Sequence, residues 1–242
     1  MGDLLKYKLD YRMRTNDFDC YDTIMPSSIL NSCQDIAGVH AEYLNVGYHN
    51  MLSKGYYWVI LRQGFKVYNE ITPRSKIIVE TFPREKNKFQ FIRDYRILDE
   101  VGETLVEGSS LWVVIDINTR SVSRATDINY VGTYETNLCD ITLTKLKFDD
   151  NFENNYTHKV TYSDLDHNKH YNNSRYLDIC MNILKLNNKN IVKEFYMDYL
   201  HEAILDDILT INYQIDDKIA YFNFVKDNKV ITKIKLIFEG EL

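Results

Sequence analysis

Apolar residues recur along this chain with two spacings, and the order of those spacings is the same in both halves. In the first half, a spacing of three and four residues follows the start signal Pro26-Ser27 and predicts a helix from about Ser27 to Leu44. In the second half, the same spacing predicts a helix that carries Tyr176, Leu177, Cys180, Ile183 and Leu184. Each helix has an apolar stripe that requires a covering sheet.

Strand patterns follow each helix and supply those sheets. In the first half they cover Tyr56–Tyr68, Lys76–Phe82, Phe89–Leu98 and Ser109–Ile117. In the second half they cover Val192–Leu200, Ile208–Ile215, Ile219–Val225 and Val230–Phe238. Short polar connections at 99–103 and 226–229 favour antiparallel hairpins over crossover helices. The sequence therefore predicts an α+β fold of two units, each an antiparallel sheet wrapped around a central helix.

The two halves are related by a shift of 147 residues, the difference between Asp17 and Asp164. This shift pairs Asp17-Phe18-Asp19 with Asp164-Leu165-Asp166, so a short acidic turn precedes each helix. Residues 127–155 lack a clear period. We therefore expect an N-terminal domain at 1–126, a linker at 127–155 and a C-terminal domain at 156–242.

Composition excludes several classes of protein. The 242 residues are 45% hydrophobic and 26% charged, which is typical of a soluble globular protein. A net charge of -6 gives no reason to expect a nucleic acid partner, and no apolar run approaches the roughly 18 residues of a membrane span. The four cysteines form no C-x-x-C pair, so we expect no structural metal, no disulfide framework and a cytoplasmic location. The chain has no G-x-S-x-G, G-x-G-x-x-G or Walker motif, and we expect no cofactor.

The candidate chemistry lies between the second acidic turn and its helix. Asp166, Asn168 and His170 occupy alternate positions, which share one side of an extended segment. The helix start that follows offers backbone N–H groups and a positive dipole end to a developing negative charge. These are the parts of an acyl-transfer site without a serine. Two alternatives stay open: a polar loop with an asparagine helix cap, and, more weakly, a metal site with His167.

The same residues carry a resemblance to a known family. The stretch from Asp166 to Tyr176 resembles the D-x-N-x-H-x-N-N-x-x-Y motif of the acyl-acyl-carrier-protein thioesterases, and Asp198–Glu202 resembles a strand on which that family places another carboxylate. The strands around Trp58 and Trp112 are similar to Trp-bearing strands of the family's first half. The resemblance implies a tandem, or double, hotdog fold.

It also implies hydrolysis of the thioester of fatty acyl-acyl carrier protein, which releases a free fatty acid and ends chain elongation. The catalytic set would be Asp166, Asn168, His170 and Glu202. We expect Glu202 to act as the general base, with the roles of Glu202 and Asp166 open to exchange. An acyl-CoA thioesterase and a non-catalytic acyl-binding module are the alternatives. The chain departs from plant members, which often carry a cysteine where Ala203 stands and begin with a plastid-targeting segment, so we expect a bacterial member.

The internal repeat predicts one active site rather than two. Under the 147-residue shift, Tyr21 replaces Asn168 and Thr23 replaces His170. Asp is kept at both positions, which also fits a role for Asp19 and Asp166 as turn residues that bond nearby amides. The first half is then expected to bind the acyl chain. The residues expected to line this acyl tunnel are Ile29, Cys33, Ile36, Ala37 and Val39.

The resemblance names acyl carrier protein as the partner, and a homodimer stays open. Because the carrier is acidic in such systems, we expect it to dock on a basic surface. The candidate residues are Arg84, Lys86, Lys88, Arg93 and Arg96. Their alternative interpretation is a solvated face with no partner.

Overall fold

The computed structural model describes residues 5–124, 128, 130–148, 152–186 and 190–240, and the chain divides into two compact units. Unit 1 comprises Met1–Thr15 and Asn31–Leu143, and unit 2 comprises Asn16–Leu30 and Thr144–Leu242. Two parts of the expected domain plan lie outside the described residues: the boundary between 126 and 127, and positions 149–151 of the linker. Within the described helices, none is long and apolar enough to cross a membrane.

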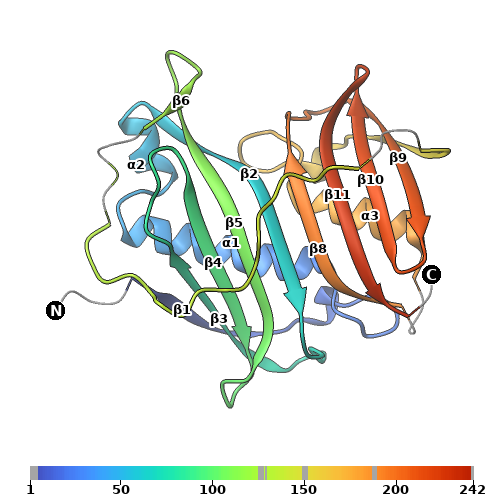
Figure 1. The fold of residues 1–242 in the computed structure, drawn as a ribbon, viewed down its shortest axis with the longest axis horizontal. Helices are drawn as coiled ribbons and strands as arrows, with labels where there is room; N and C mark the ends of the chain where they lie inside the picture. The colour runs from blue at the N-terminus through green and yellow to red at the C-terminus, as the bar shows by residue number, and fades with distance from the viewer. Residues whose placement is uncertain (1–4, 125–127, 129, 149–151, 187–189, 241–242) are drawn as a thin grey trace. The chain divides into compact units, whose positions relative to one another are not determined.

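Unit 1 contains five antiparallel strands in the order β1-β3-β4-β5-β2, with a short β6 paired to β5 (Figure 1). The strands are β1 Tyr7–Arg12, β2 Tyr56–Val67, β3 Lys76–Pro83, β4 Phe91–Leu98, β5 Thr104–Asp116 and β6 Val122–Ser123. Helix α1 spans Pro26–Tyr43, of which the part from Asn31 onward belongs to unit 1, and α2 spans Tyr48–Ser53. The apolar stripe of α1 is buried as its spacing predicts, and in unit 1 His40 of this helix contacts Arg93 of β4.

Unit 2 repeats this plan with the order β8-β11-β10-β9-β7 (Figure 1). Its strands are β7 Asn154–Lys159, β8 Ile191–Tyr199, β9 Ile208–Asp216, β10 Ile219–Lys226 and β11 Lys229–Glu239. Helix α3 spans Arg175–Leu184 and packs its buried stripe on the sheet, where the ring of Tyr176 meets Phe224 edge-on at 4.9 Å between centroids. Short 3-10 turns, Thr15–Asp17 and Tyr162–Asp164, precede α1 and α3.

Most predicted elements are confirmed to within two residues at each end, because alternation and helical spacing mark them clearly. Strand β5 differs: it begins at Thr104, five residues before the predicted Ser109. Gly108 breaks the alternation there, and a Cβ at this position would lie 2.1 Å from Cε1 of Phe65 on the neighbouring strand. The glycine is therefore a packing residue within a strand. Strand β7 is not predicted, because its residues are mostly exposed and show no apolar pattern.

The predicted hairpin turns are confirmed. The carboxylate of Asp99 accepts hydrogen bonds from the backbone N–H groups of Val101 and Glu103, at 3.0 and 2.8 Å. Between β10 and β11, Asp227 and Asn228 both have positive φ, 49° and 59°, as in the type I′ turns that suit twisted hairpins.

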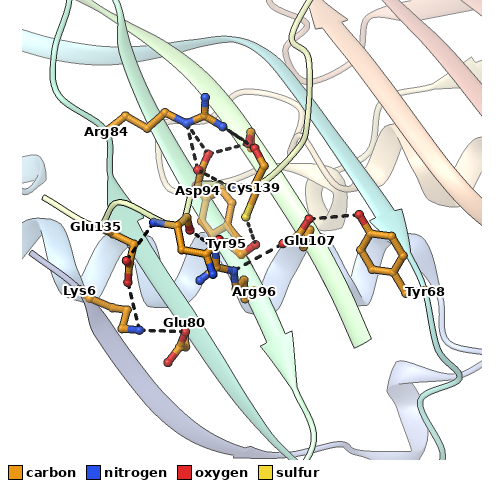
Figure 2. A network of polar contacts seen from close by, with 12 residues as sticks. Lys6, Tyr68, Glu80, Arg84, Asp94, Tyr95, Arg96, Glu107, Glu135 and Cys139 are labelled. Atoms are coloured by element: carbon orange, nitrogen blue, oxygen red, sulfur yellow. Dashed lines mark hydrogen bonds and ion pairs between the residues drawn. The ribbon is translucent and has the colours of Figure 1, made fainter. Parts of the chain in front are cut away.

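One face of the unit 1 sheet is covered by the chain around Thr133–Cys139 (Figure 2). Asp94, fully buried on β4, is the centre of this contact. It accepts hydrogen bonds from Arg84 Nε at 2.9 Å, from Ser109 Oγ at 2.6 Å and from the backbone N–H of Cys139 at 3.1 Å. Arg84 Nη2 in turn donates to the Cys139 carbonyl at 2.8 Å. We call this segment, 133–139, the strap.

The strap overturns the expected basic docking surface. Arg84 is ion-paired with Asp94, Arg93 is buried against His40, and Arg96 is buried with its guanidinium 3.5 Å from Glu107 and bonded to the Asn137 carbonyl of the strap. Lys86 is half-buried and donates to the Ile128 carbonyl, which leaves Lys88 as the exposed member of the set. The prediction and its alternative of a solvated face are both wrong for Arg93 and Arg96, because these two side chains are buried. Arg84 is half-buried in its ion pair with Asp94.

Candidate active site

The expected site begins at the turn between the 3-10 turn Tyr162–Asp164 and helix α3. Asp166 closes this turn: its Oδ1 accepts hydrogen bonds from the backbone N–H groups of Asn168 at 2.8 Å and His170 at 3.1 Å. Its own N–H donates to the His170 carbonyl at 2.8 Å, and Lys169 takes positive φ, 65°, to complete the reversal. The carboxylate thus determines where the side chains of Asn168 and His170 leave the backbone.

The first-half repeat builds the same turn. Asp19 Oδ1 accepts from the N–H groups of Tyr21 at 2.8 Å and Thr23 at 2.9 Å, and Asp22 has a φ of 60°. The two turns related by the 147-residue shift therefore have the same backbone conformation and the same hydrogen bonds to the aspartate. Both aspartates therefore act as turn residues. Only the second turn also carries an amide and an imidazole side chain, those of Asn168 and His170.

His170 and Glu202 come together although they lie on either side of α3 and β8. The backbone N–H of Tyr171 donates to the Ala203 carbonyl at 2.8 Å, and His170 forms an antiparallel bridge with Ile204. This short pairing places His170 Nε2 3.3 Å from Glu202 Oε2. The side chains are 38% and 59% exposed, so the pair is accessible to solvent.

Asn168 pairs with Asp166 instead. Its Nδ2 donates to Asp166 Oδ2 at 3.4 Å, and both ends of the Asp166 carboxylate are therefore engaged within the turn. The four expected residues form two side-chain pairs, Asp166 with Asn168 and His170 with Glu202, joined by the hydrogen bond from His170 N–H to Asp166. Among the described residues, Asp166 and Glu202 make no direct contact with each other.

The helix start offers fewer N–H donors than its sequence predicts. Asn172 N–H bonds the Asp164 carbonyl, Ser174 N–H bonds the Asn172 side chain, and Arg175 N–H bonds the Asn172 carbonyl, at 2.8, 3.0 and 2.9 Å. Of the four amides from 172 to 175, only that of Asn173 has no hydrogen-bond partner among the described residues.

Two tyrosines support the turn from inside. Tyr171 and Tyr176 pack edge-to-face at 4.6 Å between ring centroids, and both are buried. Burial raises the pKa of Tyr171 well above its ordinary value and the pKa of Tyr176 to about 12, so both phenols are neutral near pH 7. Tyr171 is therefore a packing residue under the turn rather than a base.

The metal alternative gains no support. Within the described residues, no group of three or more His, Cys, Asp and Glu side chains is placed to hold an ion. The carboxylate of Asp166, which that alternative needs, is engaged by backbone N–H groups.

Comparison with known proteins matches both halves to one family. Residues 4–131 match the model of the acyl-ACP thioesterase N-terminal domain, and residues 147–239 match that of the acyl-ACP thioesterase C-terminal domain. The palmitoyl-acyl carrier protein thioesterase of Arabidopsis thaliana chloroplasts is 25% identical over 224 residues, which are 86% of this chain and 54% of that protein. The chain thus spans about half the length of this curated relative.

Solved structures share the fold. An acyl-ACP thioesterase from Bacteroides thetaiotaomicron superimposes with a TM-score of 0.89 at 20% identity, over 97% of this chain and 98% of that one. The 12:0-ACP thioesterase of Umbellularia californica gives a TM-score of 0.82 at 18% identity, over 97% of both chains. The expected double hotdog fold of class α+β is confirmed.

Proposed function

The chain belongs to the acyl-ACP thioesterase family, and from that premise we propose that it hydrolyses the thioester of fatty acyl-acyl carrier protein, releasing a free fatty acid and ending chain elongation. The observation that carries this proposal is the 3.3 Å approach of His170 Nε2 to Glu202 Oε2 beside the turn of Asp166. A carboxylate and an imidazole in reach of one water molecule are the parts that base-catalysed hydrolysis requires.

In the proposed reaction, Glu202 accepts a proton from water, and His170 orients that water or relays its proton. The water oxygen bonds to the thioester carbonyl carbon, and the carbonyl π electrons move to the oxygen. When the carbonyl re-forms, the C–S bond breaks and its electron pair leaves with the thiolate, which the transferred proton can neutralise. The products are a fatty acid and the carrier thiol, and the enzyme returns to its starting state.

Two donors are available for the oxyanion. The backbone N–H of Asn173 is unengaged among the described residues, and the Asn168 amide holds one hydrogen towards Asp166 while its second remains to donate. Asp166 is assigned to positioning because both its oxygens accept hydrogen bonds within the turn. Because these contacts engage both Asp166 oxygens, they favour Glu202 as the general base. They also argue against Asp166 as a nucleophile that attacks the thioester directly.

The acyl chain is assigned to helix α1. Its residues Ile29, Cys33, Ile36 and Ala37 are buried on one face of the helix, and Val39 is half-buried at the edge of that face. An apolar helix face of this kind suits a hydrocarbon chain.

Acyl carrier protein is the proposed partner, and the cytoplasm the proposed location. Cys20 is exposed as a free thiol, and Cys33, Cys139 and Cys180 are free and buried, which agrees with a reducing compartment. The docking surface does not include the buried Arg93 and Arg96.

The test is release of fatty acid by the purified protein from matched acyl-acyl carrier protein and acyl-CoA substrates. Higher kcat/KM on the carrier protein supports the proposal, whereas faster turnover of acyl-CoA favours an acyl-CoA thioesterase. Binding of acyl chains without any hydrolysis would instead identify a non-catalytic module.

A further inference from the structure

The loop after strand β8 carries Glu202, and a lysine from another strand holds that loop. Lys226 Nζ donates to the backbone carbonyl of Glu202 at 3.2 Å and to Asp207 Oδ2 at 2.8 Å. The side chains of Lys226 and Asp207 are only 24% and 20% exposed, so this ion pair is less screened than one on the open surface. One ammonium group thus ties the residue that bears the proposed base to the end of its own loop.

Lys226 is a fixed point. It is the last residue of β10, and it pairs with Lys229 across the two-residue turn formed by Asp227 and Asn228. A tight hairpin of this type leaves little freedom in the direction of the preceding strand. The hairpin therefore fixes the Lys226 backbone, and the Glu202 carbonyl and the Asp207 carboxylate hold its ammonium group.

Asp207 is equally well anchored and closes the loop. Its Oδ2 accepts the N–H of Ile204 at 2.8 Å, and its carbonyl accepts the N–H of Val160 at 2.9 Å. Ile204 is also the residue that bridges to His170. Lys226 thus contacts the backbone of Glu202, and it is linked to His170 through Asp207 and Ile204.

The first half lacks this arrangement. A shift of 132 residues, the difference between Ser75 and Asp207, relates the two loops: Met13 N–H bonds the Ser75 carbonyl at 3.0 Å just as Val160 N–H bonds that of Asp207. The strand register gives the counterpart of Lys226. Ile78 and Thr210 correspond under the same shift, and they pair with Leu98 and Val225 of the neighbouring strands. Asp99 follows Leu98 as Lys226 follows Val225, so Asp99 is the counterpart of Lys226. Serine and aspartate stand where the second half has an ion pair.

We propose that Lys226 is a positioning residue for the thioesterase reaction, holding the Glu202 backbone so that its carboxylate stays beside His170. This inference rests on the proposed function, in which Glu202 is the base. The lysine touches no reacting atom in it. Its cation occurs in the half that carries Asn168 and His170 and is absent from the corresponding position of the half that lacks them.

The principal test compares Lys226→Met with the parent protein in steady-state kinetics and in hydrogen exchange of the 200–207 segment. Losing the fixed position of the base should lower kcat at least about tenfold, since small misplacements of catalytic groups have large effects on rate. KM should change less than about threefold, because the lysine does not contact substrate. Exchange in the segment should become faster, and Lys226→Arg, which keeps the cation, should restore most of kcat.

The matched control is Lys159→Met. Lys159 forms an ion pair with Asp206 of the same loop at 2.8 Å, but that pair is 62% and 70% exposed and does not reach Glu202. The control removes the same charge and should leave kcat within about twofold. If Lys226→Met does not fold, Asp207→Asn provides the second variant, because it keeps an acceptor for Ile204 while removing the charge that holds Lys226.

The outcomes separate the two proposals. Parental kcat in folded Lys226→Met or Asp207→Asn, with an active parent, overturns the positioning role and leaves a purely structural ion pair. If the parent itself hydrolyses neither acyl-acyl carrier protein nor acyl-CoA, the proposed function fails, and exchange of the 200–207 segment then decides about Lys226 alone. Unchanged exchange in that case rejects the positioning role as well.

Discussion

The imidazole Nε2 of His170 lies 3.3 Å from the carboxylate Oε2 of Glu202, and a backbone hydrogen bond from Tyr171 to Ala203 and a bridge between His170 and Ile204 join their segments. His170→Ala and Glu202→Gln should each lower kcat by at least about 10², the low end of acid–base contributions. Folding should survive because both side chains are substantially exposed. Kinetics and thermal melts on each variant measure the two effects.

The control for this pair is Thr23→Ala, the repeat counterpart of His170→Ala. It alters the same turn position in the half without an imidazole and should leave kcat within a few fold. If folded His170→Ala and Glu202→Gln work at the parental rate, the site assignment is wrong.

Asp19 and Asp166 make equivalent hydrogen bonds, so their removal should have similar effects on stability and different effects on catalysis. Asp19→Ala and Asp166→Ala each delete the acceptor of two backbone N–H groups and should lower the free energy of unfolding by about 1 to 2 kcal/mol. Only Asp166→Ala should also lower kcat strongly. Urea unfolding and kinetics on both variants test this, and equal loss of kcat in the two would contradict a single active site.

Chain-length preference tests the proposed role of α1. Cys33→Phe or Ala37→Phe adds a ring on the buried face of the helix, and the product should shift toward shorter acids if that side chain meets the acyl chain. The rival result is overpacking, a lower Tm with an unchanged product profile. Gly38→Phe is the control, since a Cβ at Gly38 meets no atom within 4 Å. A stable Ala37→Phe variant with parental products would argue against an acyl-binding role for that position.

The buried contact between His40 and Arg93 predicts a pH-dependent stability. Burial, and then the Arg93 guanidinium, lower the pKa of His40 from 6.5 to about 4. Between these values the unfolded chain binds a proton that the folded chain does not, so this residue makes stability fall as the pH decreases from 6.5 towards 4. The loss by pH 4.5 is about 2 to 3 kcal/mol.

Urea unfolding at pH 7 and pH 4.5 measures this slope. His40→Gln should flatten it relative to the parent, whereas His49→Gln, at an exposed position of α2, should leave it unchanged. The same pH dependence in all three proteins would exclude His40 as its source.

The sequence predicts most strands and both long helices well, because each of these buries one face and so shows a regular spacing. It does not reveal contacts that depend on coverage by distant chain. Arg84 and Arg96 have the composition of a solvated strand, yet the strap, far along the chain, lies over them. Strand alternation shows which side a residue faces but not what packs on that side.

The site shows the same division. The turn of Asp166 follows from the repeated acidic turn, and the presence of Glu202 beside His170 is implied by the resemblance to the thioesterase motif. The role of Lys226 follows from neither, because its sequence context indicates only a hairpin turn, and its contact with Glu202 depends on the packing of the loop after β8 against the end of β10. The sequence also does not show which amides at the helix start stay available to an oxyanion, because the Asn172 side chain accepts the N–H of Ser174.

The turns of Asp19 and Asp166 share a backbone conformation, but only the turn of Asp166 carries the proposed reactive side chains. An aspartate and one left-handed residue are enough to reproduce the backbone, whether the side chains between them are tyrosine and threonine or asparagine and histidine. A duplicated gene with such a turn can accumulate substitutions at the reactive positions of one copy while that copy still folds. The double hotdog can therefore acquire or discard reactivity by point substitution, and the spare turn around Asp19 is a natural place to install new side chains.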